Sequence, residues 1–287
     1  MTPIAAQAQD LTFTVRSGLL ERRTVLDDIS FTLPEGAVMG LVGRNGAGKS
    51  SLLRCLVGLA VPQAGGSQLL GSPSLDLSDE VRERLGYVAQ TPDLFGRLNG
   101  TEHLREMAAL YHHFDDRRAL LLALKLDLPM GLRADKLSLG DQQKLSVVLA
   151  LAHRPALLIL DEPVASLDPL ARRDFMRELF ADADADCDRK RSVLISSHLL
   201  SDLERVVTHV MFLRKGRIQL VDSWDALMEN LRLIACAEVP THAGVVHSRR
   251  VDRGRHALVD LRAAHAPADW QRGQVLRMDD LFEELNA

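Results

Sequence analysis

The sequence predicts an α/β protein: a phosphate-loop core with a mixed sheet, an inserted helical subdomain and a small α/β appendage at the C-terminal end. Three observations indicate this fold class. A glycine-rich segment, Gly43–Ser51, lies between an apolar run typical of a buried parallel strand and a helix-like pattern of leucines. A second apolar run, Leu157–Leu160, leads directly into two acidic residues. Between these segments, at about 92–153, apolar residues recur at helical spacing.

The composition excludes several classes of protein. The 287 residues are 46% hydrophobic and 26% charged, and the net charge of −4 gives no general attraction for nucleic acid. Cys55, Cys187 and Cys236 fit neither a disulfide framework nor a metal-ligand spacing, which favours a reducing compartment. No apolar run reaches the roughly 20 residues that a membrane-spanning helix needs, and the N-terminal residues lack a signal-peptide pattern. We therefore expect any membrane partner to be a separate chain.

The first 90 residues have mainly the pattern of strands. A charged insertion separates the first two strands, and a Pro-Glu-Gly turn ends the second. The third strand leads into the glycine-rich loop and the first helix. The predicted strands are Asp10–Val15, Ile29–Leu33, Ala37–Val42, a short strand around Gln68–Leu70 and a strand that ends at Gln90.

The next 60 residues have the pattern of helices. Residues 101–114 and 116–128 have apolar side chains at helical spacing, and Thr101 with nearby Glu102 and Arg105 predicts a helix start. A third helix is expected to begin near Gly140. We interpret about 92–153 as a helical subdomain inserted into the α/β core.

The second half of the chain returns to the sheet and then ends in the appendage. A helix is expected from about Leu170 to Phe180, a strand at 192–200, and a hairpin with Lys215 and Gly216 at its turn. The alternate acids Asp182–Asp188 predict a solvated loop, because a calcium loop would need a glycine and a distal glutamate. We divide the chain into a nucleotide-binding domain, 1–229, and a small appendage, 230–287, with three short strands and a terminal helix.

The glycine-rich loop satisfies the phosphate-binding pattern G-x-x-x-x-G-K-[ST]. Its glycines allow backbone conformations in which successive N–H groups converge on a polyphosphate at a helix N-terminus. Lys49 is expected to reach the β- and γ-phosphates, and the Ser50 hydroxyl is expected to ligate Mg²⁺. The predicted nucleotide-binding residues are Gly43, Arg44, Asn45, Gly46, Ala47, Gly48, Lys49, Ser50 and Ser51.

Five later stretches occur in a specific order: "YVAQ", "LSLGDQQ", "LLILDEP", "ASLD" and "LISSH". Together they resemble the ordered motifs of ATP-binding-cassette (ABC) ATPase domains, over roughly Leu11 to Val221. The most discriminating element is "LSLGDQQ" upstream of "LDEP", since other phosphate-loop enzymes lack that arrangement. The resemblance implies ATP and Mg²⁺ as cofactors and ATP hydrolysis as the reaction.

The resemblance also implies roles for individual residues. Glu162 resembles the general base that polarises the attacking water, and His198 resembles the switch histidine that contacts the γ-phosphate. Asp161 is similar to the acid that holds Mg²⁺ through water at the carboxyl edge of a parallel sheet. Gln90 resembles the glutamine that touches Mg²⁺ and the lytic water and couples the core to the helical subdomain.

A second group of residues implies a dimer. Ser138 and Gly140 resemble the signature residues that clamp the γ-phosphate of ATP held by the other subunit, where a helix N-terminus favours an anion. Asp168, within "ASLD", is similar to a residue of the loop that crosses the dimer interface. These residues imply a head-to-tail dimer with two ATP molecules between the subunits, formed by two copies or with a sister ATPase.

This chain departs from the family pattern at two places. Leu139 and Asp141 stand where the usual signature has glycine and glutamine. An adenine-stacking aromatic is expected near Val15, and the only nearby aromatic is Phe13. Because Ser138 and Gly140 are intact, we expect a functional phosphate clamp. The missing aromatic ring predicts that stacking of the base is weak or supplied differently.

The resemblance implies a subunit that energises transport through a separate integral-membrane permease, most similar to bacterial ATPases of export-type permeases. Such a subunit is expected to lie peripherally at the cytoplasmic face of the inner (cell) membrane, with no nucleic-acid partner. The alternatives are an ABC ATPase that acts on nucleic acid or ribosomes, and an importer subunit. The single set of motifs and the absence of heptads disfavour the first alternative.

Overall fold

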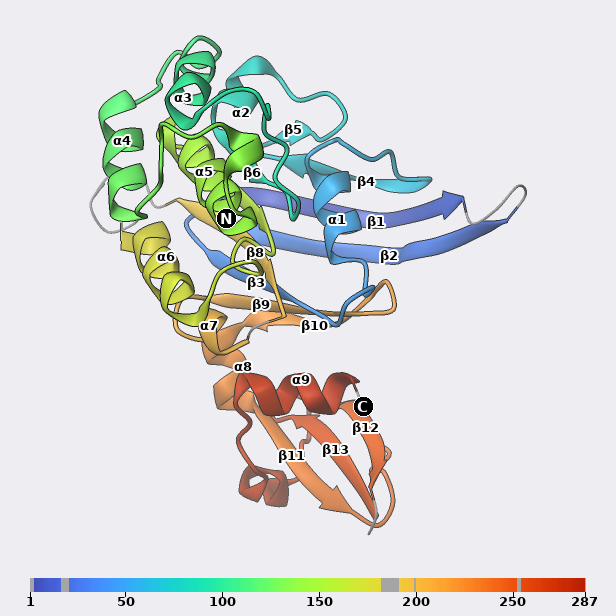
Figure 1. Ribbon diagram of the computed structural model, residues 1–287. Coiled ribbons are helices and arrows are strands. Elements are labelled where there is room, and N and C mark those ends of the chain that lie inside the picture. The colour runs from blue at the N-terminus through green and yellow to red at the C-terminus, as the bar shows by residue number, and fades with distance from the viewer. Residues whose placement is uncertain (1–2, 17–20, 182–190, 199, 252–253, 287) are drawn as a thin grey trace.

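The computed structural model describes residues 3–16, 21–181, 191–198, 200–251 and 254–286 (Figure 1). Three sheets organise this part of the chain. The acidic stretch Asp182–Asp188 lies outside the described residues. The fold is a mixed α/β architecture, which confirms the predicted fold class.

A six-stranded sheet forms the centre of the protein. All neighbouring strands are parallel except the antiparallel edge pair β9 and β10. Because the parallel strands end at one edge, the segments that follow β3, β7 and β8 meet there. The strand order is β10 (Arg217–Ser223), β9 (His209–Arg214), β3 (Val38–Val42), β8 (Ser192–Ser197), β7 (Leu157–Asp161) and β6 (Leu85–Val88).

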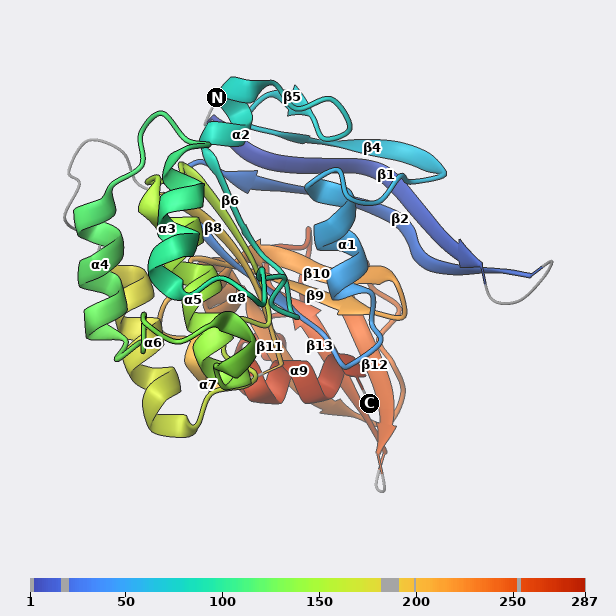
Figure 2. The same cartoon turned by 45° about the horizontal axis from the view of Figure 1, so that its top comes forward.

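A four-stranded antiparallel sheet lies beside the central sheet, and helix α1 (Lys49–Leu56) packs against both (Figure 2). The first strand of the four-stranded sheet begins earlier than the predicted Asp10–Val15. Ala5, Ala6 and Ala8 extend it, and each is at most 2% exposed. The strands are β2 (Arg22–Pro34), β1 (Ile4–Arg16), β4 (Ala64–Leu69) and β5 (Ser72–Pro73), and the short helix α2 (Asp79–Glu83) follows them.

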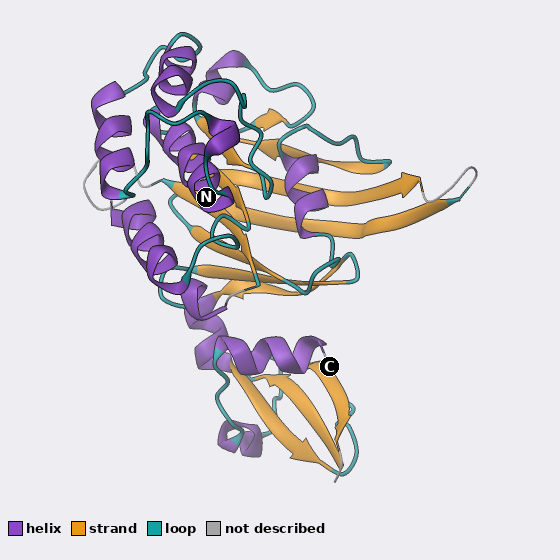
Figure 3. Ribbon diagram, viewed as in Figure 1, coloured by secondary structure: helices purple, strands orange, loops and turns teal. Residues whose placement is uncertain are grey.

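Three helices and a 3₁₀ turn follow β6 and lie together at one side of the molecule (Figure 3). The first of these helices begins at Gly100, because Asn99 caps it and Glu102 completes a reciprocal capping box. The third is buried at Gln143, at Leu145 and from Val147 onwards. The elements are α3 (Gly100–Ala108), α4 (Asp116–Lys125), η1 (Ala134–Lys136) and α5 (Leu139–Ala152).

The elements after β7 close the core. They are α6 (Pro169–Ala181), β8, α7 (Leu200–Leu203) and the β9–β10 hairpin. Lys215 and Gly216 form the turn of that hairpin with φ values of 48° and 77°, as the sequence predicts.

The described part of the C-terminal segment forms a three-stranded antiparallel sheet with three helical elements. Helix α9 lies between this sheet and the central sheet (Figure 1), where Met278, Leu281 and Leu285 belong to the same hydrophobic cluster as Phe212 of β9. The Arg214 guanidinium donates a hydrogen bond to the Leu285 carbonyl at 3.0 Å. The elements are α8 (Trp224–Asn230), β11 (Leu231–Cys236), β12 (Val245–Val251), β13 (Gly254–Asp260), η2 (Ala268–Arg272) and α9 (Met278–Asn286).

An ion pair with a buried carboxylate joins α9 to this sheet. The Glu284 side chain is 8% exposed, and Arg249 of β12 donates two hydrogen bonds of 2.6 Å to its carboxylate. His256 of β13 lies 3.3 Å from the same carboxylate. Burial alone would raise the pKa of Glu284, but the hydrogen bonds from Arg249 and His256 outweigh it, so the pKa lies below its usual value.

We expect Arg249→Met to lower the free energy of unfolding by about 2 kcal/mol at pH 7, because it leaves a largely buried carboxylate without its cation. A carboxyl with a lowered pKa stabilises the fold above its unfolded-state pKa and stops doing so as the pH falls through its folded-state pKa. The difference between wild type and variant should therefore shrink in acid. Urea unfolding followed by tryptophan fluorescence, at pH 7 and at low pH, measures this difference. The matched control is Arg250→Met at the exposed neighbouring position, and a loss as large there would contradict the assignment.

Candidate functional site

The phosphate loop connects β3 to α1 and takes the conformation that its glycines permit. A Cβ on Gly43 would lie 2.5 Å from the Leu213 carbonyl oxygen, so a side chain does not fit there. Gly46 and Gly48 have φ values of 80° and 110°, in the left-handed region that favours glycine. Gly48 is the N-cap of α1, so the exposed N–H groups of the helix end point into the loop.

The loop encloses a cavity of about 230 Å³. Its lining residues are Val25, Asn45, Gly46, Gly48, Lys49, Ser50, Ser51, Gln90 and Glu162. Gly43, Arg44 and Ala47, which are also predicted to bind the nucleotide, do not line the cavity and instead make hydrogen bonds within the loop. The Arg44 carbonyl accepts from the Ala47 N–H at 3.0 Å, and Lys49 Nζ donates to the Gly43 carbonyl at 2.8 Å.

Lys49 and Glu162 form a buried ion pair on one wall of this cavity. Their charged atoms lie 3.1 Å apart, and the two side chains are 6% and 5% exposed. The other carboxylate oxygen of Glu162 lies 2.6 Å from Nδ1 of His198, which is 43% exposed. Glu162 has a φ of 49°, a strained conformation for a residue with a side chain, as is frequent at functional sites. The structure thus brings together a buried carboxylate, a cation and a histidine at the mouth.

Ser196 of β8 contacts both acids and is not among the residues that the sequence pattern identifies. Its hydroxyl donates to Asp161 at 2.6 Å and accepts from the Glu162 N–H at 2.9 Å. A polar residue directly after three apolar residues of the strand, two positions before His198, is the signal that could have identified it.

The residues beside the phosphate loop fit a magnesium ion. Mg²⁺ prefers hard oxygen ligands and binds through few protein groups together with water and phosphate oxygens. The Ser50 hydroxyl, the Gln90 amide and the Asp161 carboxylate supply such oxygens, and all three border one continuous hollow. Asp161 is 2% exposed, and Ser196 holds one of its oxygens. No set of three His, Cys, Asp or Glu side chains in the described part of the chain offers an alternative metal site.

Ser138, Gly140 and Asp168 form a second group, away from that cavity. Ser138 caps α5, and Asp168 accepts from the N–H groups of Leu170 and Ala171, both at 3.0 Å. A Cβ on Gly140 would lie 3.2 Å from the Ser166 carbonyl, so the signature loop and the loop of Asp168 are in contact. None of the three lines the cavity formed by this chain's own phosphate loop.

No aromatic side chain is among the described residues that line the cavity. Phe13 is partly buried and packs against the core between the sheets, and Val15 is 38% exposed. Val25 of β2 is the residue of this sheet that lines the cavity.

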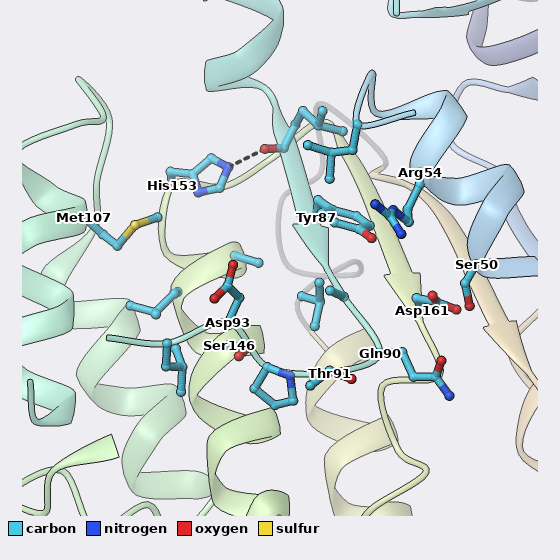
Figure 4. A pocket seen from close by; sticks show the side chains of 18 of the residues that line it. Ser50, Arg54, Tyr87, Gln90, Thr91, Asp93, Met107, Ser146, His153 and Asp161 are labelled. Carbon is cyan, nitrogen blue, oxygen red and sulfur yellow. Dashed lines mark hydrogen bonds between the residues drawn. The ribbon is translucent and has the colours of Figure 1, made fainter. Parts of the chain in front are cut away.

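A groove of about 560 Å³ lies next to the nucleotide cavity (Figure 4). Arg54 and Tyr87 lie on one wall, and Met107 and Ser146 lie on the helical side. Burial raises the pKa of the Tyr87 hydroxyl, and the charge of Asp161 adds to this effect. Ser50 and Gln90 line both the groove and the nucleotide cavity, so the two sites are neighbours.

A phosphate loop at the carboxyl edge of a parallel sheet, a buried lysine and two acids at the same edge, at the end of β7, define a phosphate-loop nucleoside triphosphatase. Comparison with known proteins identifies the family. The family model described as "ABC transporter" matches residues 26–165. The bacitracin transport ATP-binding protein BcrA of Bacillus licheniformis is 32% identical over 209 residues, which cover 72% of this chain and 67% of BcrA. The chain therefore belongs to the ABC transporter ATP-binding proteins, and it is an ATP-hydrolysing subunit of a transporter.

Two solved structures share the fold. One is described as the ATP-binding subunit of an ABC transporter; it is 29% identical, with a TM-score of 0.66, over 78% of this chain and 92% of that chain. The other is a dimeric post-hydrolysis state of the cassette MJ0796 bound to ADP and Pi, with 22% identity and a TM-score of 0.67 over 76% and 98% of the two chains. The second likeness concerns the fold alone. No helix among the described residues is long and apolar enough to cross a bilayer.

We expect Ser196→Ala to lower the ATPase rate about tenfold and to raise the Mg²⁺ concentration needed for half-maximal activity. The reason is that Asp161 loses the donor that orients its carboxylate, and the Glu162 N–H loses an acceptor. Steady-state ATPase assays over a range of Mg²⁺ concentrations measure both effects.

The control is Ser192→Ala at the other end of β8. Its buried hydroxyl accepts from the Gly36 N–H and does not line the nucleotide cavity. An equal change in the Mg²⁺ requirement in both variants would contradict the role of Ser196.

Proposed function

We propose that this protein binds and hydrolyses ATP to energise transport through a separate membrane permease, in the export direction. One observation most strongly supports coupling between ATP hydrolysis and a permease: Ser50 and Gln90 border both the nucleotide cavity and the groove. A change of nucleotide state at these residues alters the groove directly. In this proposal the nucleotide-binding domain is 1–229, and 230–287 is an appendage packed on it.

The proposed roles in hydrolysis follow from the positions of the residues. The loop residues and Lys49 bind the phosphates of ATP, and Glu162 accepts a proton from the attacking water while His198 orients it. Ser50, Gln90 and Asp161 would hold Mg²⁺, which neutralises charge on the phosphates when bound. In the present structure Glu162 is paired with Lys49. Phosphates that draw Lys49 towards them release this carboxylate for its role as a base.

The separation of the two groups of site residues supports the proposed dimer. Ser138 and Gly140 do not line this chain's own cavity, so in this proposal they act on ATP held by another subunit. A head-to-tail arrangement of two subunits then completes two sites at once. The MJ0796 cassette, which shares the fold, is itself described as a dimer bound to ADP and Pi.

The proposed partner in the groove is a short helix of the permease. The groove has apolar side chains such as Leu59 and Met107, together with Arg54 and Asp93. This mixture suits an amphipathic helix that contributes an acidic group towards Arg54. The protein would then lie at the cytoplasmic face of the cell membrane without entering the bilayer.

The proposal is tested with tagged Glu162→Gln protein, expressed in its native membranes and extracted with detergent and MgATP. We expect an integral-membrane protein to co-purify. Leu59→Asp, at a groove residue that is 61% exposed, should abolish this co-purification without loss of ATP binding. Val61→Asp is the matched control, since Val61 is 62% exposed but does not line the groove. Recovery of ribosomes or nucleic acid instead of a permease would overturn the proposal in favour of the first alternative.

A further inference from the structure

The signature loop contains an unusual arrangement of three polar side chains. The Ser138 hydroxyl donates a hydrogen bond of 2.6 Å to one oxygen of Asp141 and accepts one of 3.1 Å from the Asp141 N–H. A hydroxyl has a single proton to donate. In this arrangement that proton is used within the loop, and none remains for a ligand outside it.

The other carboxylate oxygen of Asp141 is also held in place. Lys144, one turn further along α5, lies 3.4 Å from it and donates a second hydrogen bond of 3.1 Å to the Leu126 carbonyl. The side chains of Asp141 and Lys144 are only 25% and 15% exposed. Their burial restricts the carboxylate to this position at the start of the helix.

We propose that Asp141 is a positioning residue that withholds the Ser138 hydroxyl from the ATP of a second copy of this chain. This inference rests on the proposed dimer, in which Ser138 faces the γ-phosphate of the partner. To donate to that phosphate, the hydroxyl must first leave the Asp141 carboxylate. The carboxylate also places a negative charge at the helix end that the phosphate approaches, which opposes closure of the dimer.

A purely structural role for Asp141 makes a different prediction. An acid in the first turn of a helix stabilises the helix, so its neutralisation lowers protein stability. If stability were its only role, Asp141→Asn would weaken both the fold and the dimer. In our proposal the two effects have opposite signs: the variant loses a little thermal stability but closes more readily on ATP.

The test measures ATP-dependent dimerisation of the full chain in the Glu162→Gln background, by analytical ultracentrifugation over a range of MgATP concentrations. An asparagine amide can donate to Ser138 Oγ and leave the hydroxyl proton free. We expect Asp141→Asn to lower the ATP concentration for half-maximal dimerisation about tenfold, the size expected for one hydrogen bond to a charged group. The control is Asp116→Asn, in the exposed first turn of α4.

A double-mutant cycle with Ser138→Ala decides whether Asp141 acts through the hydroxyl. We expect the effect of Asp141→Asn to be much smaller when Ser138 is alanine, because only the removal of the negative charge then remains. An unchanged or higher ATP requirement in Asp141→Asn, or an effect that persists undiminished in Ser138→Ala, would overturn the inference alone. If Glu162→Gln protein stays monomeric at every ATP concentration, the proposed self-dimer and this inference both fail.

Discussion

Glu162→Gln is expected to reduce the rate of ATP hydrolysis at least about 100-fold while ATP remains bound, because general-base catalysis of this kind contributes 10²–10⁴-fold. Glu162 is 5% exposed and lies between Lys49 and His198 at the cavity wall. Glutamine has the same shape and still offers one oxygen to Lys49, but it accepts no proton. Single-turnover phosphate release with radiolabelled ATP measures the loss, and filter binding measures the retained nucleotide.

Two further variants serve as controls for Glu162→Gln. Glu80→Gln, at a side chain that is 82% exposed, should leave the hydrolysis rate unchanged. His198→Ala should also be slow, because it removes the group that lies 2.6 Å from the carboxylate. Turnover near the wild-type rate in Glu162→Gln would show that another group acts as the base.

Lys49→Met is expected to remove measurable ATP binding and also to destabilise the protein in the absence of nucleotide. The first effect follows from the loss of the cation at the phosphates. The second follows from the ion pair: Lys49 and Glu162 are both nearly buried, so methionine leaves the carboxylate without its cation and with the contact to His198. Breaking a buried pair from one side costs about 3–5 kcal/mol in free energy of unfolding.

The double variant Lys49→Met with Glu162→Gln separates the two effects. It removes both charges, so it should regain most of the lost stability but none of the ATP binding. Urea unfolding and equilibrium ATP binding measure the two quantities on the same preparations. Equal stability of the single and double variants would contradict the stabilising role of the pair in the nucleotide-free protein.

Both predictions depend on pairs of residues that are distant in the sequence. Lys49 and Glu162 lie in two separate motifs, and each motif could be located from its neighbours: an apolar strand before it and a helix or turn after it. Their contact depends on the strand order. β3 and β7 are separated only by β8, so their carboxyl ends converge, and this order is not readable from one sequence. For the same reason Ser196, on the strand between them, was not identified in advance.

The start of strand β1 could not be predicted from the sequence for a different reason. Residues 4–9 are mostly alanine and glutamine, which have little strand preference, so the pattern predicts a strand only from Asp10. In the fold these residues pair with both β2 and β4, and the backbone hydrogen bonds on two sides override the weak local preference. The residues at which a strand begins and ends therefore depend strongly on the strands that pair with it. Whether a strand forms there at all depends less on those partners.

The sequence by itself determined the fold class, the phosphate loop and the family, because these depend on local residue types in a fixed order along the chain. It also located the departure at Asp141, as a carboxylate in a loop expected to meet ATP. Only the tertiary structure decided what those residues do to one another. It paired Lys49 with Glu162, linked Ser196 to both acids and set the Ser138 hydroxyl on Asp141. Such contacts depend on three-dimensional distance and burial, and a linear pattern of residues contains neither.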